Sequence, residues 1–393
     1  MDFRSIFYSC LTVFLIDFSC DTHVEIPVSV KVPIDYTALE NELLRDSALA
    51  GREELIRSVV EFYRMEIPNQ FSRRISLGNG RTDKVFLDEM VDKQIDSLRE
   101  TLKPTTRIAF QNIVDSQIVD TVYLIDNIRS ALSSADKYPW NRSIPDSIFL
   151  NYLLPYKVVH EYPGTWRSHL YPYYKDSLSR WSSPSHTGFD ASDAAIIEEF
   201  TINNPRGMPM WWTFDDHPLA FTKFPSLKEI LLLKKGGCYL GAMINVLILR
   251  TCGIPATIDE APYWGSMNGS HGCEVLWNAG QQKMLAGSGL EFYDQSLNRR
   301  APKVIRHTFR YTGAYSDEIA PYLKGEELQI PQMTGDHWFD ATRDYMAVSN
   351  IDIPVSENIT KKIDLGYIPG TLDFGRFLRG KMAHIFITKP RQN

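Results

Sequence analysis

An apolar segment framed by glycines, residues 235–255, limits how this chain can fold more than any other stretch. Gly236-Gly237 permits a tight backbone turn before it, while a left-handed Gly253 and then Pro255 end any helix that it forms. Its apolar residues recur at i, i+3, i+4, i+7 and i+8, the spacing of one face of a buried helix: they are Leu240, Met243, Ile244, Leu247 and Ile248. The spacing therefore predicts a buried helix whose first turn contains Cys238.

The composition is that of a globular protein. The 393 residues include 42 Lys and Arg against 48 Asp and Glu, a formal net charge of −6, and 44% of them are hydrophobic. This balance excludes a disordered, collagenous or disulfide-dense chain. Because nucleic-acid binding needs clustered Lys and Arg, and the sequence has no such cluster, we expect no nucleic-acid partner. The length allows two or three domains of roughly 150 residues each.

Residues 1–20 have the pattern of a signal peptide. Arg4 precedes a dozen largely apolar residues, 5–16, which are too few to span a bilayer but suit the apolar part of a leader. Ser19 and Cys20 follow as in a bacterial lipoprotein processing site, after which Cys20 would carry the lipid. The alternative is a buried N-terminal strand or helix. We expect an exported protein of the cell envelope, anchored to the membrane through Cys20 and facing the periplasm or the cell surface.

Helical spacing dominates the next part of the chain, residues 21–150, which we predict to be a helical N-terminal region. One of its helices is predicted from an apolar series that ends before Pro139: Phe110, Ile113, Val114, Ile118 and Val122.

A core region is predicted over residues 151–312 and a short β region over 313–393. The core opens on a stretch rich in Tyr and Trp that runs to Tyr174, interpreted as packing, with a glycan- or peptide-binding surface as the alternative. Ser226 and Glu229 have the spacing of a capping box at a helix start. From about residue 256 the pattern becomes β-like, with further strands expected at 351–355 and 383–388.

The position of Cys238 suits a nucleophile. The unpaired N–H groups and partial positive charge of a helix N-terminus favour the thiolate and lower the pKa of the thiol. The same N–H groups can receive a developing oxyanion. Most free cysteines are small buried hydrophobes, and this is how we interpret Cys252 and Cys273, which lack such a setting.

A reactive thiol needs a base, and His271 lies at the start of a predicted strand 33 residues after Cys238. An isolated His in such a place is usually a surface or hydrogen-bonded residue, but this pairing makes it the candidate base. Glu291 and Asp294 follow on what would be the adjacent strand. Either carboxylate could orient the imidazole, and both could equally be solvated.

Several segments resemble the transglutaminase-like superfamily, which has a papain-type fold and a Cys-His-Asp/Glu site. The resemblance narrows further to a bacterial lipoprotein group within this superfamily, and it covers nearly the whole chain. The matching segments, in order, are residues 50–55, 153–157, 166–167, 237–238, 249–255, 259–265, His271 on its strand, 302–304 and 340–345. The resemblance implies that Cys238 is the nucleophile, His271 the base and a later acid the orienting group. The chain departs from the superfamily in two ways. Cys273 stands where the superfamily usually has Trp, and residues 284–288, where an Asp is common, contain no acid.

We therefore expect an α+β protein with a helical N-terminal region, a transglutaminase-like core with an antiparallel sheet, and a short C-terminal β region. The predicted activity is thiol chemistry on the amide bond of a peptide or protein substrate, including cell-wall or glycan-linked ones, by hydrolysis or transfer, without a cofactor or Ca²⁺. The alternative is a catalytically inactive surface protein of the same fold that binds glycan or peptide. A weaker idea is zinc held by Cys238, His271 and Cys273, which lacks a fourth ligand at recognisable spacing.

Overall fold

The computed structural model describes most of the chain between residues 33 and 345. The described ranges are 33–78, 85–101, 107–137, 144–181, 213–214, 224–262, 264, 270–278, 282–286, 293–294, 299–300, 303–312 and 337–345. The predicted leader with Cys20, the acid Glu291 and the strands expected at 351–355 and 383–388 lie outside them. Within these ranges, no helix combines the length and the apolar character needed to cross a membrane.

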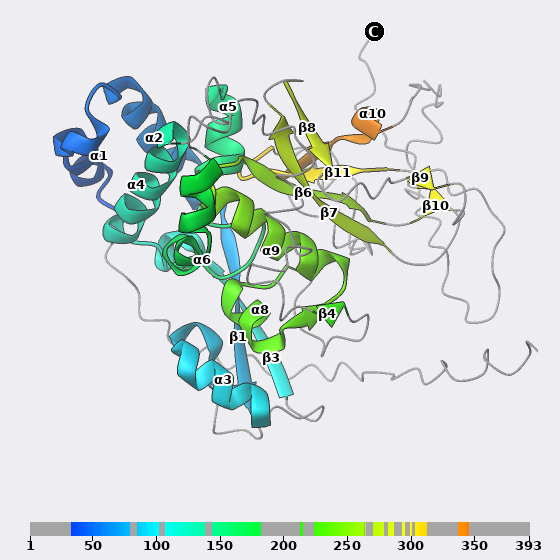
Figure 1. The fold of residues 1–393 in the computed structure, drawn as a ribbon. Coiled ribbons are helices and arrows are strands. Elements are labelled where there is room, and N and C mark those ends of the chain that lie inside the picture. The colour runs from blue at the N-terminus through cyan, green and yellow to red at the C-terminus, as the bar shows by residue number, and fades with distance from the viewer. Residues whose placement is uncertain are drawn as a thin grey trace, which may run out of the picture. The chain divides into compact units, whose positions relative to one another are not determined.

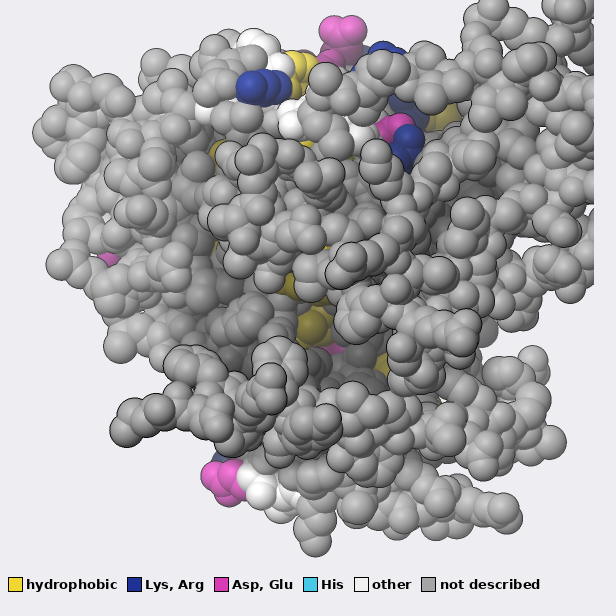
Figure 2. All heavy atoms as spheres, turned by 90° about the vertical axis from the view of Figure 1, so that its right-hand side faces the viewer, with side chains coloured by type: hydrophobic (Ala, Val, Ile, Leu, Met, Phe, Trp, Pro, Cys, Tyr) yellow, Lys and Arg dark blue, Asp and Glu magenta, His cyan; other side chains and the backbone are white. Residues whose placement is uncertain are grey.

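The architecture is α+β, as predicted. Helices and mainly antiparallel sheets alternate along the chain (Figure 1). On the face shown in Figure 2, charged side chains of both signs lie along the upper edge, and hydrophobic side chains lie deeper in the surface.

Three helices of the N-terminal region pack together, since α1 contacts both α2 and α4. The elements of this region are α1 Tyr36–Arg45, η1 Ser47–Leu49, α2 Glu53–Glu66, η2 Ile67–Asn69, β1 Phe71–Gly78, β2 Val85–Phe86, η3 Leu87–Glu89, α3 Asp92–Thr101, β3 Arg107–Val114, η4 Asp115–Gln117 and α4 Thr121–Lys137. A three-stranded antiparallel sheet of order β2-β1-β3 accompanies the helices, so this region is not purely helical.

The prediction of a helix from Phe110 to Val122 is wrong. Residues up to Val114 form β3, which pairs antiparallel with β1 over its whole length, and α4 begins only at Thr121. The apolar residues at 110, 113 and 114 fit helical spacing, yet Phe110 and Val114 are exposed and only Ile113 is buried. The partner strand lies about forty residues upstream, and local periodicity cannot detect such a pairing.

Aromatic residues of the next segment form core, as the packing interpretation predicted. Tyr156, Trp166 and Tyr174 are buried, and the indole N–H of Trp166 donates to the Tyr156 carbonyl at 2.8 Å. The elements here are α5 Asp146–Ile148, η6 Phe149–Leu153 and α6 Trp166–Trp181, which contains Pro172. α8, Leu227–Leu233, begins with the predicted capping box of Ser226 and Glu229.

The candidate catalytic elements belong to a five-stranded antiparallel sheet of order β12-β11-β6-β7-β8. Its strands are β6 Ala256–Ala261, β7 His271–Asn278, β8 Lys283–Ala286, β11 Ile305–His307 and β12 Trp338–Asp340. Helix α9, Cys238–Thr251, packs on β6 and β7 (Figure 1). Four other short strands of the described residues form two separate pairs: β4 Thr213–Phe214 pairs parallel with β5 Lys235–Gly236, and β9 Tyr293–Asp294 pairs antiparallel with β10 Arg299–Arg300. β12 belongs to the predicted C-terminal β region but forms an edge of the core sheet.

A buried ion pair links the N-terminal region to the core region. The ammonium of Lys157 lies 2.6 Å from Asp115, and both side chains are almost completely buried. The other carboxylate contacts are hydrogen bonds from the hydroxyls of Tyr156 at 2.7 Å and Ser72 at 2.6 Å. Lys157 also donates to the Phe71 carbonyl at 2.8 Å, so this network joins β1, η4 and the segment before α6.

A second long-range connection passes through His337, just before β12. Its imidazole contacts the carbonyls of Asn69 and Phe309, each at 3.1 Å, and the Gln70 side chain at 3.3 Å. Gln70 in turn donates to the Phe309 carbonyl at 2.6 Å. Residues 69–70, 309 and 337 therefore form one polar cluster although they are up to 268 positions apart.

Candidate functional site

Helix α9 begins at Cys238, as predicted. Gly237 is its N-cap residue and has no side chain that could cap the first N–H groups of the helix, next to the half-buried Cys238. Position 236 has no room for a larger residue than glycine, because a Cβ there would lie 2.5 Å from the Leu240 side chain. The predicted C-terminal end of α9 is also confirmed, because the backbone of Gly253 adopts the left-handed conformation, with a φ of +78°.

The start of α9 lies against the start of β7. The ring of Tyr239 covers Gly272, where an added Cβ would lie 2.5 Å from the ring. Leu276, on the same face of β7, belongs to the hydrophobic cluster around α9. Because side chains alternate along a strand, residues 272, 274 and 276 face the helix, while His271 and Cys273 belong to the opposite face.

His271 begins β7, as predicted, and is buried. Its imidazole stacks on Trp264, with ring centroids 5.8 Å apart and an interplanar angle of 21°. Trp264 packs in a cluster with Cys273, Val275 and Trp277, which confirms that this face of β7 is separate from the α9 face.

The thiol of Cys273, on the His271 face of the strand, is shaped mainly by burial. Burial raises the pKa of Cys273 well above its ordinary value, and negative charge on Asp259, Glu274 and Cys238 adds to the rise. A charge acts on its neighbours only at short range. The contact that the structure shows between the first turn of α9 and β7 is the one that Tyr239 makes with Gly272. The pairing of Cys238 with His271 stays a prediction.

The other two described thiols are core residues, as predicted. Cys252 and Cys273 are buried and reduced. Burial raises the pKa of the Cys252 thiol well above its ordinary value, as it does for Cys273. A raised pKa and a buried sulfur make both thiols poor nucleophiles at neutral pH.

The prediction for the third member of the site needs a correction. The neighbour of β7 is β8, which ends at Ala286, so Asp294 is not on the adjacent strand. Asp294 lies in β9, whose partner is β10 in a separate two-stranded sheet. That β8 occupies the edge next to β7 could not be predicted from local patterns. Glu291, the other candidate, lies outside the described residues.

A His-Glu pair that the sequence did not reveal lies on the α9 face of the sheet. His307 of β11 and Glu260 of β6 are buried, with the imidazole Nε2 3.1 Å from the carboxylate. Phe224 packs edge-on against both His307 and Tyr239, at 5.0 Å and 5.7 Å between ring centroids. The alternation of β6 was the available signal, since Asp259 and Glu260 must face opposite sides.

The chain matches no family model, curated protein or solved structure.

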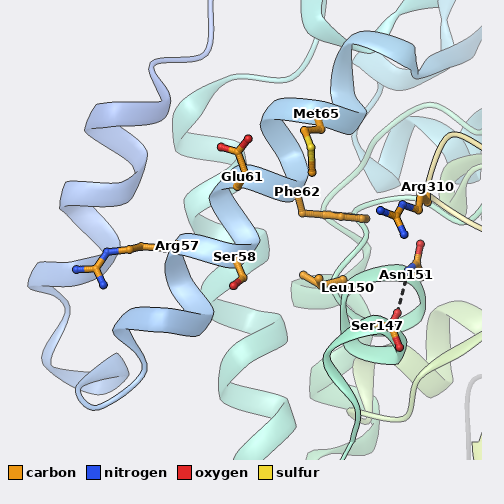
Figure 3. A pocket seen from close by; sticks show the side chains of 9 residues that line it. All are labelled: Arg57, Ser58, Glu61, Phe62, Met65, Ser147, Leu150, Asn151 and Arg310. Carbon is orange, nitrogen blue, oxygen red and sulfur yellow. Dashed lines mark hydrogen bonds between the residues drawn. The ribbon is translucent and has the colours of Figure 1, made fainter.

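A surface pocket of about 490 Å³ lies elsewhere, between α2 and the α5–η6 segment (Figure 3). Phe62 and Met65 of α2 face Leu150 across it, and Arg310 extends toward it. Neither Cys238 nor His271 lines the pocket, so we do not assign it to the candidate site. In the described ranges, no three His, Cys, Asp or Glu residues form a group that could hold a metal ion.

Replacing Gly272 by alanine is expected to move the first turn of α9. The new Cβ would lie 2.5 Å and 2.6 Å from two atoms of the Tyr239 ring, so the ring has to shift. Such overpacking destabilises by about 1–3 kcal/mol, and we expect slower alkylation of Cys238 as well. Urea unfolding and iodoacetamide mapping measure the two effects. Gly164→Ala is the matched control, because nothing lies within 4 Å of its added Cβ. Equal behaviour of the two variants would contradict this packing.

Proposed function

We propose that this protein is a transglutaminase-like thiol enzyme that acts on amide bonds of peptide or protein substrates, including cell-wall or glycan-linked ones. The observation that carries the proposal is the position of Cys238: it is the first residue of a buried helix whose start lies against the first residues of β7. A helix-start thiol, an antiparallel sheet and a strand that begins with His support the proposal, and the approach of His271 to the thiol is part of what is proposed.

In the proposed reaction, the Cys238 thiolate attacks the carbonyl carbon of the amide. The uncapped N–H groups at the start of α9 are suited to stabilise the oxyanion that forms. As the C–N bond breaks, His271 gives its proton to the leaving amine, and the acyl group remains on the sulfur. Water or a second amine then attacks the thioester, its proton passes to His271, and the C–S bond breaks to release the acyl group and restore the Cys238 thiolate. Of the two acids expected to orient His271, Glu291 stays the candidate, because Asp294 is not on the strand next to β7.

The location of the protein belongs to the same proposal. Export and a lipid on Cys20 rest on the leader alone. A thiol enzyme held at the membrane would meet substrates of the cell envelope.

The test is the reactivity of Cys238 in the folded protein. We expect iodoacetamide to alkylate Cys238 well below about pH 8.5, the ordinary pKa of a thiol, because the helix N-terminus favours the thiolate. His271→Ala is expected to slow this alkylation at neutral pH. Peptide mapping separates Cys238 from Cys252 and Cys273, which serve as internal references in the same sample. Alkylation of Cys238 at the rate of a free thiol, with no effect of His271→Ala, would favour the binding protein over the enzyme.

A further inference from the structure

β3 is an edge strand of the three-stranded sheet, and one of its two sides has no partner strand among the described residues. The order of this sheet is β2-β1-β3, and all eight residues of β3 pair one to one with β1 (Figure 1). β1 is paired along both sides, since it also meets β2 and its Arg73 N–H donates to the His160 carbonyl at 2.7 Å. An edge strand presents a row of backbone N–H and C=O groups that can pair with a further strand.

Two hydrogen bonds show which backbone groups of β3 point away from β1. In an antiparallel pair, successive residues direct their N–H and C=O groups alternately toward the neighbour and away from it. The Asp115 N–H donates to the Gln70 carbonyl at 3.0 Å, which directs residues 107, 109, 111 and 113 toward β1. Arg73, whose N–H donates on the other side of β1, lies opposite Asn112 and gives the same result. The backbone groups of residues 108, 110, 112 and 114 therefore point away from β1.

β3 lacks the features that commonly protect an edge strand. It has eight residues, contains neither proline nor lysine, and has no bulge in its register with β1. Its one charged residue, Arg107, is its first. Phe110 and Val114 are 47% and 41% exposed, so the strand also presents apolar side chains to solvent. A long edge of this kind is a site for pairing with another chain.

We propose that β3 pairs antiparallel with β3 of a second copy of this chain, around a two-fold axis at Gln111. In this register, residue 108 lies opposite residue 114 of the second copy, and residue 110 lies opposite residue 112. All four residues whose backbone groups point outward therefore pair with one another. The result is one antiparallel sheet of six strands, three from each copy. This interface is independent of the proposed function.

The charge and the side chains of β3 favour a second copy as its partner. Residues 108–114 are uncharged, so no like charges meet across the two-fold axis. The register brings Ile108 opposite Val114 at both ends, and apolar cross-strand pairs stabilise a sheet. The interface is isologous, since the same strand of each copy supplies both halves, and such two-fold dimers are the commonest symmetric oligomers.

The oligomeric state of the full chain tests the pairing. Sedimentation velocity over a wide range of concentrations should show an equilibrium between monomer and dimer. Asn112→Pro removes an N–H that points away from β1, and proline is tolerated at such a place in an edge strand. Because the symmetry repeats the lost hydrogen bond, the dissociation constant of the dimer should rise about tenfold or more. Asn112→Ala keeps the N–H and is the matched control, with dimerisation as in the wild type. Urea unfolding checks that both variants keep the fold.

Single cysteines test the register. Gln111→Cys places two sulfurs opposite each other at the axis, where the Cα atoms of such a pair lie about 4.5 Å apart, within reach of a disulfide. Mild oxidation should therefore link the two copies, and peptide mapping separates this link from any made by the native cysteines. Asn112→Cys is the control, because its two copies are diagonal neighbours and too far apart for a disulfide.

Three results would each overturn the inference. The first is a chain that stays monomeric at every concentration, which would leave the edge to a partner other than a second copy. The second is equal dimerisation of Asn112→Pro and Asn112→Ala. The third is a dimer without a link at residue 111, or with one at residue 112 that forms as readily.

Discussion

Replacing Asp115 by alanine is expected to lower the free energy of unfolding by about 3–5 kcal/mol, because it leaves the buried ammonium of Lys157 without its counter-charge. The pair is 2.6 Å apart and nearly inaccessible to water. The same change removes the acceptor for Tyr156 and Ser72. Urea unfolding followed by circular dichroism measures the loss.

An exposed ion pair provides the control for this experiment. Arg64 and Glu61 are 2.7 Å apart on α2, but each side chain is about half exposed. Glu61→Ala is therefore expected to change the stability by at most about 0.5 kcal/mol. Lys157→Met combined with Asp115→Ala should recover part of the loss, since the double variant buries no lone charge. A loss from Asp115→Ala as small as that of Glu61→Ala would contradict the buried network.

Replacing Glu274 by glutamine is expected to stabilise the protein above neutral pH. Glu274 faces α9 from β7, where burial raises its pKa from 4.5 to about 7, partly offset by a hydrogen bond from Asn245. Its Oε1 is buried without a hydrogen-bond partner among the described residues. Below about pH 4.5 the carboxyl is protonated in both the folded and the unfolded state. As the pH rises to 7, the unfolded state loses its proton first, so the folded state becomes less stable.

A difference of two and a half pKa units corresponds to roughly 3 kcal/mol. Glu274→Gln should therefore match the wild type near pH 4.5 and exceed it by an amount on the order of 3 kcal/mol at pH 8. The measurement is urea unfolding of both proteins over this pH range. Glu61→Gln, at an exposed position, should show the same pH dependence as the wild type. A constant difference between Glu274→Gln and the wild type would rule out the raised pKa.

Sequence alone predicted the helix that carries the candidate nucleophile with both of its ends. This was possible because the determinants are local: glycines that turn the chain at Gly237 and Gly253, and apolar residues repeated on one helical face. The start of β7 at His271 and the capping box at Ser226 were predicted for the same reason.

Features that depend on distant partners were missed. β3 resembled a helix because its pairing with β1 bridges about forty residues, and Asp294 was assigned to a strand position that β8 occupies. Glu260 and His307 are 47 positions apart and meet only because β6 and β11 are neighbours. Alternation along β6 indicates the face on which Glu260 lies, but the local sequence does not identify His307 as its partner.

The cluster around His337 has a consequence for biosynthesis. Contacts from His337 to Asn69 and Phe309, and the edge strand β12 beside it, are made by residues near the end of the described chain. A nascent polypeptide has to emerge from the ribosome to about residue 345 before these contacts can close, and such distant closures slow folding. Until then the open edge of β11 is exposed, which makes the incomplete chain a natural client for chaperones.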